Sequence, residues 1–349
     1  MHHERTRYLG GRGYLAACTL GLPADVTREA VRRDLDAWAA GRATAADYSA
    51  GLERARGHAA TLLGAQPQQI ATGSQVSVFT GLVAASAPRG SEVLVVDGDF
   101  SSMVAPFLAH GGLHVRHVPL EALADEVRPE TAFVSYSLVQ SATGAIADAA
   151  AVAAAARDAG ALALVDTTQA TGWMPTDDLD ADVVVCHAYK WLGAPRGAAF
   201  AAFSERAIAE VTPFTAGWYS GADPWTSCYG PSLHLADDAT RFDVSPAWNA
   251  WAGAEAALGL AASLDMDAVR EHDLALANSF RAGLGLEASD SAIVSWADPT
   301  GCDLASLTTA GVTASGRAGR ARVAFHVWND TEDVALALEA LQPHAAFAI

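Results

Sequence analysis

The segment LALVDTTQATGWMPTDDLDADVVVCHAYKWLGAPRG, from Leu162 to Gly197, decides how the fold of this chain is interpreted. Two apolar runs, Ala161–Thr167 and Asp182–Tyr189, have the length and composition of buried strands. The second run leads directly into Lys190. Because ligands of open parallel sheets bind beyond the carboxyl ends of the strands, the polar residues at these two ends are candidates for chemistry.

Apolar runs of the same kind occur on both sides of this segment. The alanine-rich stretch Ala149–Asp158 is predicted to be a helix, because Gly160 follows it as a typical helix terminator. Alternating strands and helices predict a mostly parallel sheet that is covered on both faces, and therefore an α/β fold. The other predicted strands are Glu92–Phe100, Leu113–Pro119, Thr131–Val139 and Ala198–Phe203.

The pattern changes after Trp248, which indicates a second and smaller α+β domain. A long helix rich in alanine and leucine is predicted over 250–264, and a closing helix over Glu332–Leu341 with Asp330 or Thr331 as its cap. A chain of 349 residues is long enough for two domains. We expect an N-terminal arm over residues 1–20, a large domain over 21–249 and a small domain over 250–349.

The composition limits the partners and the compartment. The formal net charge of −18 argues against nucleic acid and anionic membranes, both of which need a basic face. No apolar run is long enough to span a membrane, and the first residues do not resemble a secretory signal. The four cysteines lie far apart without a CxxC pair, so we expect no zinc site and no disulfide framework. A reduced, cytoplasmic setting fits these features best.

Lys190 is the only lysine of the chain, beside 21 arginines. A coding bias explains arginine wherever only positive charge matters, so the remaining lysine marks a place where arginine does not serve. Arginine stays protonated, whereas a lysine amine can lose its proton and attack a carbonyl. The sequence therefore points to a Schiff-base lysine.

Two further features support this interpretation. Asp166 places a carboxylate at a strand end, and the turn 71–75 precedes an apolar helix whose free amides suit a phosphate. Taken singly, Asp166 could cap a turn, and His187 and Tyr189 could pack in the core. Lys190, the turn 71–75 and Asp166 together supply what pyridoxal phosphate requires: an amine, a binding site for the phosphate and an acid for the pyridine nitrogen.

The sequence resembles the class V aminotransferase family of fold-type-I pyridoxal-phosphate enzymes. This branch contains cysteine desulfurases, kynureninase, isopenicillin-N-epimerase-like proteins and aminotransferases. The resemblance covers nearly the whole chain and is most specific in an Asp-x-x-Gln motif at Asp166 to Gln169. About twenty residues later, Lys190 begins a Lys-x-x-x-x-Pro-x-Gly motif. The resemblance implies a cofactor-binding large domain and a homodimer with shared active sites.

The resemblance also assigns roles to individual residues. Lys190 would form the Schiff base and move protons, Asp166 would pair with the pyridinium nitrogen, and Gln169 would contact the phenolic oxygen of the ring. Phe100 would stack on the ring, as in kynureninase, although a packed core phenylalanine is the competing interpretation. The residues implied at the phosphate are Ser74, Gln75, His187 and Tyr189, with Ser245 reaching the phosphate of the partner subunit.

Arg322 is the residue that the resemblance implies for the substrate α-carboxylate. Arg317 and Arg320 lie close by in the sequence, so this choice depends on register. A strand over 322–328 would place Arg322 and His326 on one face, away from an apolar face that packs on the helices. Gln140 lies in a loop that would flank the substrate.

The reaction type is less constrained than the cofactor. Classical desulfuration needs a mobile cysteine before the carboxylate-binding arginine, and the stretch Gly311–Gly319 contains none, while Cys302 does not match the motif. We expect an aminotransferase acting on an α-amino acid. Pyridoxal-phosphate-dependent β-elimination of the C–S lyase kind, kynureninase-like hydrolysis and epimerisation remain alternatives. A non-enzymatic binding role is disfavoured, because it would not require the single lysine.

Overall fold

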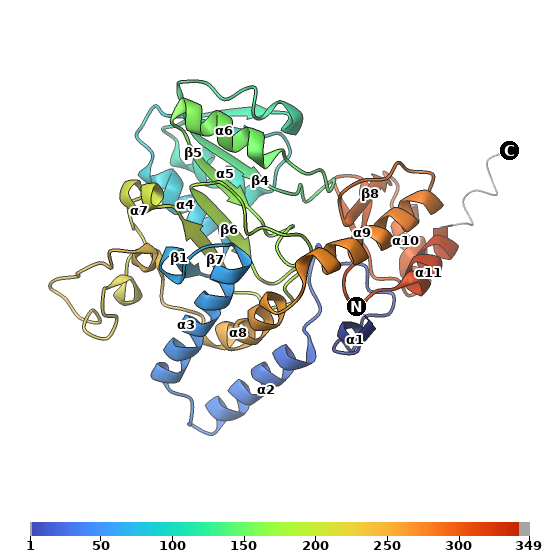
Figure 1. The fold of residues 1–349 in the computed structure, drawn as a ribbon, viewed down its shortest axis with the longest axis horizontal. Coiled ribbons are helices and arrows are strands. Elements are labelled where there is room, and N and C mark those ends of the chain that lie inside the picture. The colour runs from blue at the N-terminus through green and yellow to red at the C-terminus, as the bar shows by residue number, and fades with distance from the viewer. Residues whose placement is uncertain (1, 342–349) are drawn as a thin grey trace.

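A seven-stranded sheet forms the body of the molecule. The structure is a computed structural model that describes residues 2–341. The strands are β1 (Ile70–Gly73), β2 (Glu92–Val96), β3 (His114–Val118), β4 (Thr131–Ser137), β5 (Leu162–Asp166), β6 (Val183–His187) and β7 (Ala199–Phe203), in the order β1-β7-β6-β5-β4-β2-β3 (Figure 1). Each of the six strands predicted from the sequence is present with slightly shorter bounds, so those predictions are confirmed.

The direction of the strands brings the carboxyl ends of β1 to β6 to one edge. Strands β2 to β6 are mutually parallel, and β7 is antiparallel to both β6 and β1. Strand β1 therefore runs in the same direction as β6. The segments after β1, β2, β4, β5 and β6 consequently leave the sheet at the same edge, which is the usual ligand-binding edge of such sheets.

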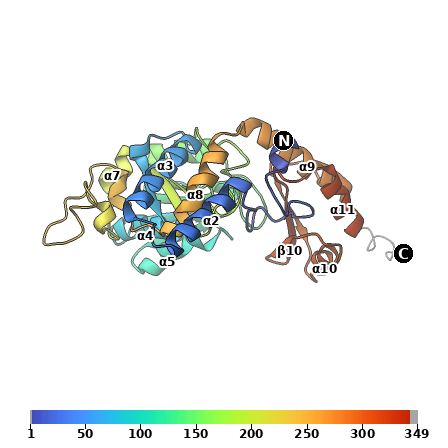
Figure 2. The same ribbon diagram turned by 90° about the horizontal axis from the view of Figure 1, so that it is seen from below.

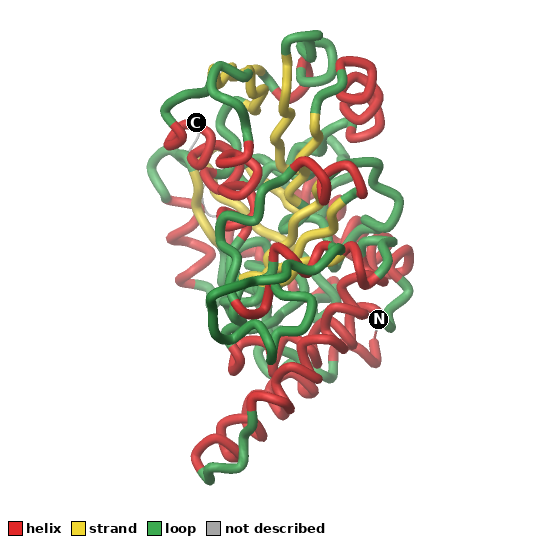
Figure 3. The backbone as a smooth tube through the Cα atoms, turned by 90° about the vertical axis from the view of Figure 1, so that its left-hand side faces the viewer, coloured by secondary structure: helices red, strands yellow, loops and turns green. Residues whose placement is uncertain are grey.

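Helices cover both faces of this sheet, as the alternating side chains of its strands require. Along β6, Val183 and Val185 pack in the core with Phe79 of α4, whereas Val184 packs in the core with Leu258 of α8 on the opposite face. The helices of this part are α2 (Asp25–Ala39), α3 (Ala45–Leu62), α4 (Val76–Ser86), α5 (Ser101–His110), α6 (Ala149–Ala159), α7 (Glu205–Glu210) and α8 (Trp248–Ala262). The α2–α3 hairpin projects from the body (Figure 3).

A second, three-stranded antiparallel sheet lies at the other end of the elongated molecule (Figure 2). Its strands β8 (Ile293–Ala297), β10 (Arg320–Ala324) and β9 (Ser315–Arg317) are accompanied by α9 (Met266–Gly283), α10 (Cys302–Thr309) and α11 (Thr331–Leu341). Phe280 and Val323 belong to its core. The short helices are α1 (His2–Arg5), η1 (Pro67–Gln69), η2 (Leu120–Ala122), η3 (Trp218–Ser220) and η4 (Ala239–Phe242). The predicted mostly parallel α/β fold with a smaller α+β part is confirmed; the boundaries 1–20, 21–249 and 250–349 stay a prediction.

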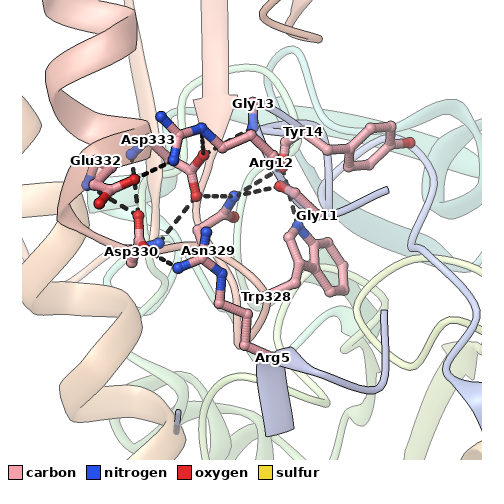
Figure 4. A network of polar contacts seen from close by, with 10 residues as sticks. All are labelled: Arg5, Gly11, Arg12, Gly13, Tyr14, Trp328, Asn329, Asp330, Glu332 and Asp333. Atoms are coloured by element: carbon pink, nitrogen blue, oxygen red, sulfur yellow. Dashed lines mark hydrogen bonds and ion pairs between the residues drawn. The ribbon is translucent and has the colours of Figure 1, made fainter. Parts of the chain in front are cut away.

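The N-terminal arm is bound to the small sheet and to α11. The amide of Gly13 donates to Asp333 Oδ1 at 2.8 Å, and Asn329 Nδ2 donates to the carbonyls of Gly11 and Tyr14 at 3.2 Å each (Figure 4). The carbonyl of Leu15 accepts from Ala324 at the end of β10 at 2.8 Å. The chain then reaches the segment after β6, where the amide of Gly21 donates to the carbonyl of Tyr189, so this part of the chain connects the two sheets.

The predicted strand over 322–328 is wrong in its second half, because β10 ends at Ala324. The backbone turns there: the amide of Asn329 donates to the carbonyl of His326 at 2.7 Å, and Asn329 Oδ1 accepts from the amide of His326 at 3.0 Å. The partner strand β8 begins at Ile293, opposite Ala324, and offers no further partners. His326 therefore lies in a turn rather than on a strand face.

Among residues 2–341, no helix is both long and apolar enough to cross a membrane.

Candidate active site

The site is built at the edge where β5 and β6 end. Asp166 is the last residue of β5, and Lys190 follows three residues after the end of β6. Thr168 joins the two strand ends, because its amide donates to Asp166 Oδ1 at 2.8 Å and its hydroxyl accepts from the amide of His187 at 2.9 Å. These two bonds fix the carboxylate of Asp166 relative to the segment that carries the lysine.

The amine of Lys190 is buried, and its side chain is only 6% exposed. Burial lowers the pKa of Lys190 to about 8, because a charged ammonium is poorly solvated there. The Nζ atom lies 5.3 Å from the ring centroid of Phe100 and 5.8 Å from that of Tyr189, and it forms no hydrogen bond within residues 2–341. Such an amine is partly deprotonated near neutral pH and can act as a nucleophile or a base.

Asp166 is buried beside this amine. Burial raises its pKa, while the bond from Thr168 and the charge of Lys190 act in the opposite direction. A cationic nitrogen facing this carboxylate would stabilise the ionised form, as the predicted contact with a pyridinium requires.

His187 provides a test of whether an anionic cofactor fits this edge. Its Nε2 is buried and has no hydrogen-bond partner among the described residues, which is unusual for a buried polar atom. Burial lowers the pKa of His187 to about 4, so the imidazole is neutral at neutral pH and Nε2 can carry a proton for an oxygen. An acceptor such as a phosphate oxygen would satisfy this atom.

The turn after β1 offers a second place for an anion. Helix α4 begins at Val76 with Gln75 as its N-cap, and no side chain caps it. The amides of the first turn are therefore available to an anion. Ser74 is partly buried and Gln75 is exposed. Together with His187 and Lys190, this helix start makes the edge of the sheet compatible with pyridoxal phosphate.

Tyr189 and Phe100 place aromatic rings around the amine. Arg196 lies over the ring of Tyr189, with 4.9 Å from its guanidinium carbon to the ring centroid. Burial raises the pKa of Tyr189. Phe100 is 43% exposed at the start of α5, which does not match a packed core phenylalanine. Asp99 holds the start of this helix, because it accepts from the amides of Phe100 and Ser137.

Gln169 and Arg322 meet at Ser141, which follows Gln140 in the loop expected to flank the substrate. Its hydroxyl accepts from Gln169 Nε2 and from Arg322 Nη1, both at 3.1 Å. Gln169 also donates to the carbonyl of Cys18 at 2.9 Å, and Arg322 donates from Nη2 to the hydroxyl of Thr19 at 2.8 Å. Arg322 is fully buried, although we expected a cleft-facing side chain on a strand.

The other two candidate arginines point elsewhere. Arg320 donates to the hydroxyl and the carbonyl of Ser295, each at 2.9 Å, and Arg317 is exposed and donates to the carbonyl of Gly316. Of the three, Arg322 is the one joined to Gln169, through Ser141.

Within residues 2–341, neither Gln140 nor Ser245 forms a hydrogen bond with Gln169, Ser141 or Arg322. Gln140 is buried and donates to the carbonyl of Ser137 at 3.2 Å. Ser245 is exposed, two residues after Asp243, which is buried and paired with Arg56 at 2.7 Å. The contributions of Thr19 and Cys18 could not be found from the sequence, because no motif marks them and Thr19 lies 303 positions from Arg322.

Comparison with known proteins identifies the family of this chain. Residues 36–314 match the family described as aminotransferase class-V. The chain belongs to the class-V aminotransferase family. This family is pyridoxal-phosphate-dependent, so the predicted cofactor and the predicted class of transferase or lyase are confirmed at the level of the family.

Among curated relatives, kynureninase of Deinococcus radiodurans is 30% identical over 256 residues, which are 70% of this chain and 62% of that protein. Isopenicillin N epimerase of Amycolatopsis lactamdurans is 32% identical over 191 residues, 48% of this chain and 47% of that protein. The matched segments thus span less than two thirds of these relatives. The cysteine desulfurase CsdA of Escherichia coli has the same fold, with a TM-score of 0.86 at 19% identity over 100% of this chain and 99% of that one.

The pKa of Lys190 gives a direct prediction. The protein without cofactor, treated with an amine reagent such as formaldehyde and cyanoborohydride, should be modified at Lys190 with a pH midpoint near 8. The reactive free amine accumulates as the pH rises through this value, well below the usual lysine range. Peptide mapping separates this lysine from the α-amino terminus; a midpoint near that of an exposed lysine would show that the amine is not desolvated.

Proposed function

We propose that this class-V protein is an enzyme that acts at the α-carbon of an α-amino acid, with Lys190 as its cofactor lysine. The observation that carries this proposal is the buried Lys190 amine beside the buried Asp166, at the sheet edge where His187 leaves a polar atom unpaired. When bound, pyridoxal phosphate supplies an aldehyde that condenses with amines and a ring that delocalises an electron pair from the substrate α-carbon.

With this cofactor bound, each residue of the site would have a separate role in binding or proton transfer. Asp166 holds a proton at the ring nitrogen, and His187 and the start of α4 bind the phosphate. Gln169 and Phe100 orient the ring. Lys190 Nζ removes the α-proton and returns it, since its pKa of about 8 allows both directions near neutral pH.

We place transamination first, because the stretch Gly311–Gly319 carries no cysteine for a sulfur relay. In a transamination, Lys190 would return the proton to the cofactor carbon rather than to the α-carbon. Kynureninase-like hydrolysis is the second candidate. It is supported by the exposed Phe100 beside the amine and by the 30% identity with kynureninase.

The first test concerns the cofactor and the reaction together. Borohydride should fix one phosphopyridoxyl group on Lys190, identified by peptide mass, and a panel of amino acids should yield keto acid with aminated cofactor. Anthranilate and alanine from kynurenine would favour hydrolysis, and pyruvate with ammonia would favour elimination. A protein that gains no phosphopyridoxyl mass would exclude Lys190 as the cofactor lysine.

Arg322 is proposed to bind the substrate carboxylate. Its Nη1 donates to Ser141, its Nη2 to Thr19 and its Nε to Ser315. A carboxylate would take over one N–H group of Nη1 and one of Nη2, while Nε keeps its bond to Ser315. A planar guanidinium offers two parallel N–H groups to a carboxylate, whereas an ammonium does not.

Replacing this guanidinium should weaken substrate binding selectively. Arg322→Lys should raise KM about ten- to hundredfold, since a charged hydrogen bond contributes about 1.5–3 kcal/mol, with the absorption spectrum of the bound cofactor unchanged. Steady-state kinetics measure this effect. Arg320→Lys, two residues away on β10, is the matched control; if it alone raised KM, the assignment would move to Arg320.

We also propose a homodimer, with α2 in the interface. Its residues Val31, Leu35 and Trp38 are 37%, 55% and 62% exposed and follow a helical spacing along one face. Val31 and Leu35 line an apolar groove together with Leu20 and Arg196. Arg196 belongs to the segment that follows Lys190. A second copy of this chain would cover this surface, and its Ser245 would reach the phosphate of the first.

Charge on this helix face should separate the subunits. Leu35→Glu with Trp38→Glu should convert a dimer into a monomer in sedimentation velocity, because two charges would have to be buried in an apolar contact. Leu108→Glu, at a similarly exposed leucine of α5, should leave the dimer intact. A wild-type protein that sediments as a monomer would contradict the proposal.

A further inference from the structure

The backbone of Trp191, the residue after Lys190, is held by a histidine of the small domain. His326 Nε2 lies 3.0 Å from the carbonyl oxygen of Trp191, and His326 Nδ1 lies 2.8 Å from Asp273 Oδ2 on α9. His326 is 2% exposed and Asp273 is fully buried. A buried Asp–His pair thus ends on the residue next to the only lysine.

The hydrogen-bond partners of the His326 imidazole show which of its ring nitrogens carries a proton. A carbonyl oxygen can only accept, so Nε2 must carry a proton and donate to Trp191. Asp273 then holds the other nitrogen, either as a carboxylate facing an imidazolium or as an acid facing a neutral ring. In both forms Asp273 keeps the ring oriented with its Nε2–H toward Trp191, because the partner of one ring nitrogen sets the state of the other.

The two other backbone carbonyls near Lys190, those of Tyr189 and of Lys190 itself, accept hydrogen bonds from backbone amides. The carbonyl of Tyr189 accepts from the amide of Gly21, directly after the arm, and the carbonyl of Lys190 accepts from Gly193 within the loop, each at 2.9 Å. Within residues 2–341, the side chain that donates a hydrogen bond to a backbone carbonyl of this loop is that of His326. It contributes a contact from the small domain that neither glycine supplies.

The loop in turn positions a second residue of the candidate site. The indole nitrogen of Trp191 donates to Gln169 Oε1 at 3.0 Å, and the rings of Trp191 and His326 are in contact with centroids 5.2 Å apart. A displacement of Trp191 would therefore move both the backbone of Lys190 and the amide of Gln169.

His326 is itself fixed to the arm and to α11. Asn329 accepts from the amide of His326 and donates to Gly11, Tyr14 and Asp333 in the network of Figure 4. A continuous series of hydrogen bonds thus runs from the arm through Asn329 and His326 to the lysine loop.

We propose that His326, oriented by Asp273, is a positioning residue that fixes the carbonyl of Trp191, directly after Lys190, and transmits the placement of the small domain to the lysine amine. The inference rests on the proposed role of Lys190 as the cofactor lysine. It concerns the burial and reach of the amine, which can be measured without turnover.

The test removes the donor from His326 and observes Lys190 in the cofactor-free protein. His326→Leu should slow capture of pyridoxal phosphate at Lys190 by about tenfold or more, because small displacements of a reacting group cost one to two decades. Its pH midpoint for methylation should rise from about 8 toward the usual lysine range, since loosening of the loop rehydrates the amine. The groups facing Lys190 stay unchanged in this variant: Asp166, Cys186, Cys18 and Arg322.

Two further variants separate the hydrogen bond from general packing. His326→Gln places an amide donor near the position of Nε2 and should restore capture to within about threefold of wild type, as expected for a retained hydrogen bond. His326→Asn carries the same donor one methylene short and should behave like His326→Leu, which keeps the test informative if the leucine variant does not fold. His272→Gln is the matched control, because His272 is the neighbour of Asp273 on α9 and contacts Asn329 but not the lysine loop.

The outcomes distinguish the two proposals. Wild-type capture rate and midpoint in a folded His326→Leu or His326→Asn protein would overturn the positioning role, and so would an equal effect of His272→Gln. If wild-type protein captured no pyridoxal phosphate at Lys190, the proposed function would fail. The methylation midpoint would still decide whether His326 controls the burial of the amine.

Discussion

The burial of one amine at the carboxyl edge of the sheet is the constraint on which the site depends. A charged group removed from water is destabilised unless it is paired, and the lysine responds by a pKa lowered to about 8. That shift requires the amine to stay covered. The cover comes from three sources: Phe100 and Tyr189 around the amine, the arm crossing the backbone, and the small domain behind the loop.

Gly21 shows how closely the arm approaches the lysine. A Cβ atom at this position would lie 1.7 Å from the carbonyl oxygen of Lys190, so no other residue fits without moving the loop. The amide of Gly21 donates to Tyr189 at the same crossing. Because the arm is also bound to β10 and α11, the two sheets and the lysine loop form one connected structure. The site therefore depends on residues from both ends of the chain.

The sequence could predict those parts of the site that are set by local patterns. The apolar runs predict β5 and β6. Because the carboxyl ends of parallel strands lie at the same edge of a sheet, they also predict that Asp166, His187 and Lys190 lie at one edge. The same reasoning failed for 322–328, where the apolar alternation continues but Asn329 folds the backbone into a turn. It also missed Thr19, and it did not predict the contact of Ser141 with Arg322 or that of His326 with Trp191, because these contacts join segments that lie far apart in the sequence and carry no local signature.

The reaction type is not determined by the parts of the site that local sequence patterns predict. A lysine and a carboxylate at the edge of the same fold serve several chemistries, and the relatives of this chain include a kynureninase and an epimerase while a desulfurase shares its fold. Fold and cofactor residues alone do not choose among these outcomes. The choice depends on which side chains lie at the α-carbon and where its proton is returned. In this chain Ser141, Thr19 and Arg322 come from distant segments and are joined by hydrogen bonds. If Arg322 binds the substrate carboxylate as we propose, the choice of reaction depends on these long-range contacts between the N-terminal segment, the large sheet and β10.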